Sequence, residues 1–259
     1  MSGGLVLLRK ELLESWRTLR LPIVTGLFLV VGLTSPLLAR FLTEIIEAAG
    51  GAELGSIQIP TPVAADATSQ LWKNLAQFGA IAAIVLAMSS VAAEKERGTA
   101  AFVLSKTVSR GAFLASKIVA IGAVLALGVV LATAVAWFYT TVLFEPLPVA
   151  GWVAFAVLAW LGLAVWGAIT FAGSVVTGST AAAAGVGFVG FLVLSIASAV
   201  PAVGHYLPGG LAEPAVALAA GMPAEGGDIA TAVLGSVVVI VAALVIAGRS
   251  FHSCAAVPG

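Results

Sequence analysis

The charged side chains with a recognisable arrangement gather in one stretch, EKERGTAAFVLSKTVSRGAFLASK, which runs from Glu94 to Lys117. Apolar runs too long for an ordinary globular core flank it on both sides. Its middle places four side chains at the spacing of one helix face, and these are Thr99, Phe102, Val103 and Lys106. A short helix with an apolar stripe is suited to binding in a groove of another protein. The stretch therefore predicts that residues 94–110 bind another protein.

Residues for other kinds of chemistry are scarce. The chain has one cysteine, Cys254, so neither an internal disulfide nor a cysteine metal site is expected. Its two histidines, His205 and His252, are too few and too far apart to predict a metal centre. No phosphate-binding G-x-x-x-x-G-K-[ST] motif occurs, so ATP chemistry would require another subunit. The expected spans contain serines such as Ser174 and Ser195 but no histidine to act as a base, which disfavours an intramembrane protease.

The composition predicts an integral membrane protein. Of the 259 residues, 61% are hydrophobic and 9% are charged, whereas a soluble domain carries roughly 25% charged residues. We expect an all-α polytopic protein that forms one domain over 1–259. Its six spans are expected at about 21–39, 74–93, 112–141, 149–176, 181–203 and 229–248. We expect no ionisable side chain at membrane depth, which disfavours coupling through a buried carboxylate.

An amphipathic helix is expected ahead of the first span, at 5–20. Its apolar residues recur at helical spacing, and they are Leu5, Leu8, Leu12, Trp16 and Leu19. Basic and acidic residues occupy the rest of the helix surface, which is typical of a helix in the membrane interface. The alternative, the charged start of a cleaved signal peptide, fits less well because the segment is periodic and contains acids.

Polar connections separate the spans. Residues 40–73 are predicted to be an external loop, helical at most at its start, with a break at Pro60-Thr61-Pro62. Residues 204–228 form a second external connection, whose apolar middle suits a half-helix that protein must cover. Gly98 should end the structure that precedes it, and Ser109 is a plausible N-cap for the third span.

The basic residues predict the orientation in the membrane. With both termini inside, ten lie inside, namely Arg9, Lys10, Arg17, Arg20, Lys95, Arg97, Lys106, Arg110, Lys117 and Arg249. Two, Arg40 and Lys73, lie outside. Because loops rich in lysine and arginine stay in the cytoplasm, we expect a multi-pass plasma-membrane protein with both termini and residues 94–110 cytoplasmic.

Two features of the later spans leave alternatives open. Gly185, Gly187 and Gly190 give the fifth span a small-residue surface, which an internal neighbour or a second copy of the chain could use. Trp160 and Trp166 lie inside the fourth span, where they either line a substrate path or pack against protein and lipid.

In layout and in its first cytoplasmic loop, the chain resembles the permease subunit of ABC-2 transporters, over essentially its whole length. The matching letters are Glu94, Glu96, Arg97, Gly98, Thr99, Leu104, Ser105, Val108, Ser109, Arg110 and Lys117. The family usually has proline just before V-S-R, where this chain has Thr107. The resemblance implies the type V exporter-like permease fold.

The resemblance also implies partners and a site. In that family the first cytoplasmic loop forms a coupling helix that binds a separate ATPase, and two permeases assemble with two ATPases. ATP and magnesium would then belong to the partner, with no cofactor, metal or catalytic residue in this chain and no nucleic acid. The implied coupling residues are Glu94, Glu96, Arg97, Gly98, Thr99, Phe102, Val103, Ser105 and Arg110. The simpler alternative is that these charges only solvate the loop and fix its orientation.

The first and fifth spans build the subunit interface in similar permeases, which favours a homodimer through Gly185, Gly187 and Gly190.

Three functions remain open at this point. The first is the permease of an ATP-driven exporter. The second is a membrane component that transmits ATP-driven motion to an extracytoplasmic partner, as in relatives that resemble the permease of the copper-site maturation system for nitrous oxide reductase. A passive channel or secondary carrier is less favoured. The uncharged interior suits an apolar, amphipathic or lipid-like cargo, with hydroxyls such as Ser195 and Ser198 at the dimer interface.

Overall fold

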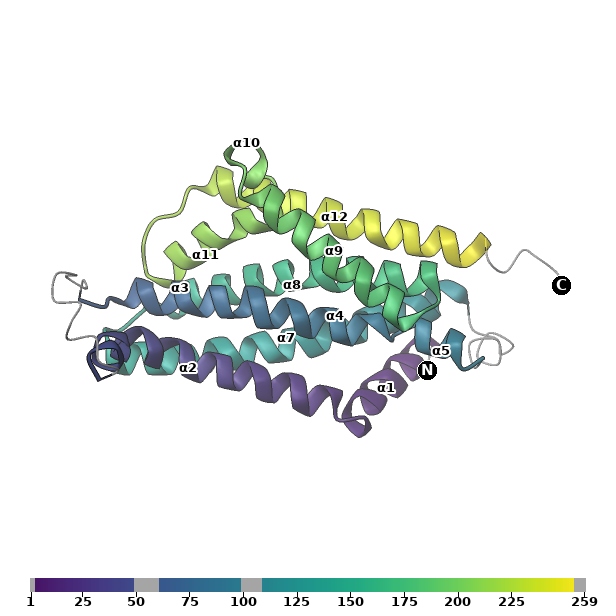
Figure 1. Cartoon of the computed structure of the whole chain (residues 1–259), viewed down its shortest axis with the longest axis horizontal. Helices are drawn as coiled ribbons and strands as arrows, with labels where there is room; N and C mark the ends of the chain where they lie inside the picture. The colour runs from purple at the N-terminus through teal and green to yellow at the C-terminus, as the bar shows by residue number, and fades with distance from the viewer. Residues whose placement is uncertain (1–2, 49–60, 99–108, 254–259) are drawn as a thin grey trace.

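The fold is a bundle of long helices that run along one common direction (Figure 1). The structure, a computed structural model, describes residues 3–48, 61–98 and 109–253. Every regular element in those ranges is a helix. Six helices are long and apolar enough to cross a membrane. The prediction of an all-α protein with six spans is therefore confirmed.

The chain begins with two helices joined by a tight turn. Helix α1 (Gly3–Arg17) is followed by Thr18 and by Leu19, whose φ of 60° lies in the left-handed region, and then by α2 (Arg20–Ala48). Helix α2 is longer than the predicted span of 21–39, because the helix continues past Pro36 into the expected loop. The turn at Leu19 lets α1 lie at an angle to the bundle (Figure 1).

The second span differs most from its prediction. Residues 64–73, expected in a loop, form α3 (Ala64–Asn74), which continues through one π-helical turn, η2 (Leu75–Gly79), into α4 (Ala80–Met88). The helix starts early because the Asp66 carboxylate accepts a hydrogen bond from the Val63 backbone N–H at 2.9 Å. Leu71 is fully buried, so α3 has an apolar face that packs in the bundle.

The four later long helices are close to their predicted spans. They are α7 (Arg110–Leu143), α8 (Val149–Thr177), α9 (Thr180–Ser198) and α12 (Gly226–Ser253). Ser109 caps α7 as predicted, because its hydroxyl accepts from the Ala112 N–H at 3.2 Å. Helix α9 ends at Ser198, five residues before the predicted limit at 203, and a turn leads to the short α10 (Pro201–Gly204).

Helix α8 is the centre of the bundle, packed against α4, α7, α9 and α12. The 3-10 turn η3 (Pro208–Leu211) and α11 (Ala212–Ala219) also pack on it. Leu211, Ala215 and Ala219 are fully buried, so protein covers one face of this short apolar helix. The predicted half-helix is thus present, while its depth in a bilayer stays a prediction.

The ends of the bundle differ in what they carry. Helix α1, the short α5 (Ala92–Glu96) and the C-terminal end of α12 lie at one end, whereas α3 and α11 lie towards the other (Figure 1). Six spans return the chain to its starting side, so both ends of the described chain and the start of the 94–110 stretch share one face.

Candidate functional site

The described part of the candidate docking stretch begins with a tight turn and a single helical turn. Helix α4 ends at Met88, and α5 begins at Ala92. Gly98 follows with φ at +70°, and its N–H donates to the Lys95 carbonyl. The prediction that Gly98 ends the preceding structure is confirmed, since glycine reaches this backbone region without steric cost.

A serine from α8 holds the start of α5. The Ser174 hydroxyl accepts hydrogen bonds from the backbone N–H groups of Val91 at 3.1 Å and Ala92 at 2.9 Å. Ser174 is fully buried, and the first N–H groups of a helix have no partner within the helix. One side chain therefore satisfies two backbone donors and fixes α5 to the central helix.

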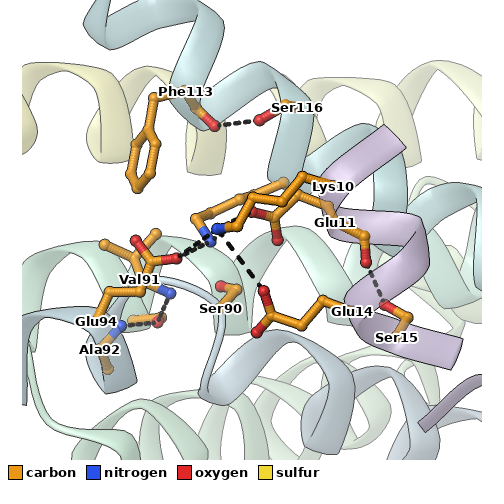
Figure 2. Close-up of polar contacts among 12 residues, drawn as sticks. Lys10, Glu11, Glu14, Ser15, Ser90, Val91, Ala92, Glu94, Phe113 and Ser116 are labelled. Carbon is orange, nitrogen blue, oxygen red and sulfur yellow. Dashed lines mark hydrogen bonds and ion pairs between the residues drawn. The ribbon is translucent and has the colours of Figure 1, made fainter. Parts of the chain in front are cut away.

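Glu94 joins α5 to two other helices. Its carboxylate receives the Lys117 ammonium of α7 at 2.8 Å, and the same ammonium lies 3.1 Å from Glu11 of α1. Lys117 is only 3% exposed. Lys10 of α1, whose side chain is 47% exposed, lies 3.4 Å from Glu11, 3.6 Å from Glu94 and 3.7 Å from Glu14 (Figure 2). We call Lys10, Glu11, Glu14, Glu94 and Lys117 the cluster.

The cluster raises the pKa of Lys10. Partial burial lowers the pKa of Lys10, but the nearby carboxylates of Glu11, Glu94 and Glu14 offset this and leave the pKa above its usual value. Positive and negative groups alternate through the cluster, so α1, α5 and α7 are held together electrostatically at this end of the bundle.

The next two residues contact the junction of α8 and α9. The Lys95 ammonium donates to the Val175 carbonyl in the last turn of α8. The Glu96 carboxylate accepts from the Thr180 N–H at 2.8 Å and the Thr180 hydroxyl at 3.0 Å. A cation at a helix C-terminus and an anion at a helix N-terminus both complement the helix dipole.

Three consecutive side chains thus bind α1, α7, α8 and α9. We call residues 89–97, with these contacts, the clamp. Within the described residues, no group of three or more potential metal ligands occurs. What the clamp can do is mechanical: a displacement of α5 would be passed to four helices at once.

The predicted coupling residues have different positions relative to the clamp. Glu94 and Glu96 make contacts within the chain, whereas Arg97 and Gly98 are exposed. Arg110 opens α7. The remaining residues lie outside the described ranges, and they are Thr99, Phe102, Val103 and Ser105.

The glycines of the predicted dimer surface are not equivalent. A Cβ built at Gly187 would lie 2.2 Å from the Thr170 hydroxyl of α8, and one at Gly190 would lie 2.9 Å from Ile169. These two glycines therefore let α9 pack closely on α8, the internal neighbour. A Cβ at Gly185 would meet nothing within 4 Å, so its part in an interface between copies stays a prediction.

A second site lies towards the other end of the bundle. A cavity of about 540 Å³ opens between the π turn η2, α8, α9 and η3. Its apolar wall includes Trp72, Trp166 and Phe191, and the last two rings pack edge to face at 5.2 Å. Its polar side chains are Lys73, Gln77, Ser195 and Ser198. Ligand pockets commonly combine an apolar lining with a few polar groups, and π turns recur at functional sites.

The two tryptophans of the fourth span have different surroundings. Trp166 is mostly buried and lines this cavity. Trp160 is 36% exposed, and its indole N–H donates to the Gly122 carbonyl at 2.9 Å. The hydroxyl-bearing Ser195 and Ser198 belong to the cavity within one chain, whether or not a second copy also approaches them.

Sequence reasoning missed several of these partners. The expectation that the spans hold no ionisable side chain is wrong for Lys117, which lies buried in α7 within a candidate membrane span. The sequence analysis counts Lys117 only as a basic residue, and its pairing with Glu11 joins residues 106 positions apart. Ser174 was considered only as a nucleophile. One feature of the sequence could have indicated that Lys117 is paired. It lies one helical turn after Phe113, inside the expected third span, where an isolated cation needs a partner.

The chain shares sequence with known proteins. A family described as "ABC-2 family transporter protein" matches residues 5–253. An uncharacterized transmembrane protein, YxlG of Bacillus subtilis (strain 168), is 27% identical over 146 residues. That alignment covers 56% of this chain and 57% of the relative, so the chain spans little more than half of the relative's length.

Proposed function

The chain belongs to the ABC-2 family of transporter proteins, and from this premise we propose that it is the permease subunit of an ATP-driven exporter. Its ATPase is a separate chain, which binds at residues 94–110. Two copies of the permease assemble with two ATPase subunits in the plasma membrane. Both termini lie in the cytoplasm, on the side of the ten basic residues.

The observation that carries this proposal is the clamp. A cytoplasmic loop that merely connects two spans needs no rigid attachment to the rest of the protein. Here the entry of the loop is bound to α8 through Ser174, to α7 and α1 through Glu94, and to α9 through Glu96. Such an attachment is what a partner would need to move the spans by moving the loop.

The cavity supports the proposal that the permease transports a cargo molecule. Its aromatic wall and small set of polar groups suit an apolar or amphipathic molecule with one hydrogen-bonding end. Gln77 offers a donor and an acceptor, and Ser195 and Ser198 offer hydroxyls. This cavity favours the exporter over a subunit that only transmits motion to an external partner.

The experiment is purification of the chain from its native membrane, with and without its ATPase. We expect an ATP-binding subunit to co-purify, and we expect ATP hydrolysis only when that subunit is present. Phe102→Ala should weaken capture at least about thirtyfold, since an aromatic anchor is typically worth about 2 kcal/mol or more. The same change at the exposed Phe138, on the opposite end of the third span, should leave capture unchanged.

Two results would overturn the proposal. One is ATP hydrolysis by the purified chain alone. The other is undiminished capture by both Phe102→Ala and the double variant Glu96→Ala/Arg97→Ala, which would leave residues 94–110 as a solvated connector.

A further inference from the structure

A small cavity of about 270 Å³ lies beside the clamp, at the end of the bundle that carries α1. Its lining residues come from α1, the first residue of α2, the end of α4, the α4–α5 turn, α5 with the following Arg97, and the early part of α7. Most of the lining residues are charged or polar, and its apolar lining includes Leu86, Ala120, Ile121 and Val124. The cavity therefore presents charge and an apolar wall to the same occupant.

The charges that line this cavity are unequally paired. The ammonium groups of Lys10 and Lys117 are bound by the three carboxylates of the cluster. The other two cations, Arg20 and Arg97, make no ion pair with any residue that the structure describes. Four cations against three carboxylates leave a surplus of one positive charge.

The cavity is also lined by a serine hydroxyl that can donate a hydrogen bond. Ser89, in the α4–α5 turn, lines the cavity, and its hydroxyl makes no hydrogen bond within the described residues. The neighbouring Ser90 is different, because its hydroxyl donates to the Ala87 carbonyl at 2.7 Å. Two guanidinium groups and one free hydroxyl are the donors that recognise phosphate oxygens.

We propose that this cavity binds the phosphate headgroup of an anionic phospholipid from the inner leaflet. One phosphodiester carries the single negative charge that the lining lacks. The volume, below the roughly 300–1,000 Å³ of pockets for whole small molecules, fits a headgroup whose acyl chains stay in the bilayer. Leu86 and Ile121 would contact the first carbons of those chains. Basic pockets between spans on the cytoplasmic side are known to suit lipid headgroups.

The bound lipid would connect the first span to the clamp. Arg20 is the first residue of α2, and Arg97 follows the last residue of α5. A phosphate between them would bind α5 to α2, a helix to which the clamp makes none of the contacts described above. The inference needs the orientation proposed above but does not depend on an ATPase or on a cargo.

The test uses the full-length chain without its ATPase, because Arg97 is also an expected ATPase contact. The chain is placed in nanodiscs of phosphatidylcholine with a minor share of phosphatidylglycerol, then released into mild detergent for native mass spectrometry. We expect selective retention of phosphatidylglycerol. Arg20→Gln/Arg97→Gln should lower that retention by about tenfold or more, because each guanidinium donates charge-assisted hydrogen bonds to phosphate.

The control is Arg9→Gln/Arg17→Gln, which removes the same charge from α1 at residues that do not line the cavity. It should retain phosphatidylglycerol as the unchanged protein does. Arg97→Gln alone alters only an exposed side chain, so it serves as the second variant if the double variant fails to fold. Arg20→Lys/Arg97→Lys should give intermediate retention, because the charge remains and the planar donor fork is lost.

Three outcomes would overturn the inference. Equal loss in the control pair would mean attraction by the general surface charge. Equal retention of phosphatidylcholine and phosphatidylglycerol would remove the headgroup selectivity. Displacement of the lipid by millimolar inorganic phosphate would mean that the cavity holds free phosphate rather than a lipid.

Discussion

At the scale of single residues, the buried Lys117 joins three helices at the end of the bundle that carries α1. Its ammonium lies between the carboxylates of Glu11 and Glu94, from two different helices. We expect Lys117→Met to lower the free energy of unfolding by about 3–5 kcal/mol, because it leaves two partly buried carboxylates without their main counter-ion. The measurement is thermal or denaturant unfolding in a fixed detergent.

Lys10 provides the matched control for that change. It belongs to the same cluster, but its side chain is 47% exposed. Lys10→Met should therefore cost only about 0–1 kcal/mol, as exposed ion pairs do. Glu11→Gln in the Lys117→Met background should cost less than it does alone, since the two groups interact. Strictly additive effects would contradict the contact.

Ser174 permits a second residue-scale prediction. Ser174→Ala removes the acceptor of the Val91 and Ala92 N–H groups, and we expect a loss of about 1–3 kcal/mol for each donor left without a partner. Ser236→Ala is the control, because Ser236 is equally buried but donates only to the Ala232 carbonyl of its own helix. Equal effects of the two changes in an unfolding experiment would refute the role given to Ser174.

At the scale of elements, the sequence predicted the long helices well and the contacts between them poorly. Apolar length and turn residues located six spans, and Ser109 and Gly98 marked helix ends by local chemistry. The early start of α3 depends on the Asp66 hydrogen bond and on the burial of Leu71. Because polar residues are frequent in 64–73, the sequence pattern indicated a loop there instead of a helix. The partners of Glu94, Lys95 and Glu96 lie far away in the chain, so no local pattern could indicate them.

The packing of α9 on α8 gives the element-scale prediction. Gly187→Ala places a methyl group against Thr170, and overpacking of this kind costs about 1–3 kcal/mol. Gly185→Ala meets open space, so unfolding should be unchanged or slightly harder, because alanine favours a helix over glycine. Unfolding of both variants checks this. Their oligomeric state, measured by light scattering, tests the predicted interface: a change with Gly185→Ala alone would place the second copy at that residue.

At the scale of the whole molecule, the arrangement separates two functions along the bundle. The clamp and α1 occupy one end of the bundle, and α3 lies towards the other (Figure 1). The cavity is lined by the last residues of α3, the turn η2, the C-terminal part of α9 and η3, together with α8. Helix α8 contributes to both, through Ser174 in the clamp and Trp166 in the cavity. A displacement of the clamp can therefore reach the cavity along one continuous helix, which is the physical basis of the coupling that we propose.

The last prediction concerns which end of the bundle faces the cytoplasm. Nine of the twelve basic residues lie in the described part of the end that carries α1 and the clamp, and Lys106 lies between α5 and α7 in the sequence, outside the described residues. We expect that end to face the cytoplasm. In a Cys254→Ser background, cysteines at Val63 and Gly226, both exposed, should react with a membrane-impermeant reagent in intact cells. A cysteine at the exposed Thr18 should react only after the cells are opened. Labelling of the Thr18 position from outside, with protection of Val63 and Gly226, would reverse the molecule in the membrane and place the clamp beyond the reach of any ATP-driven partner.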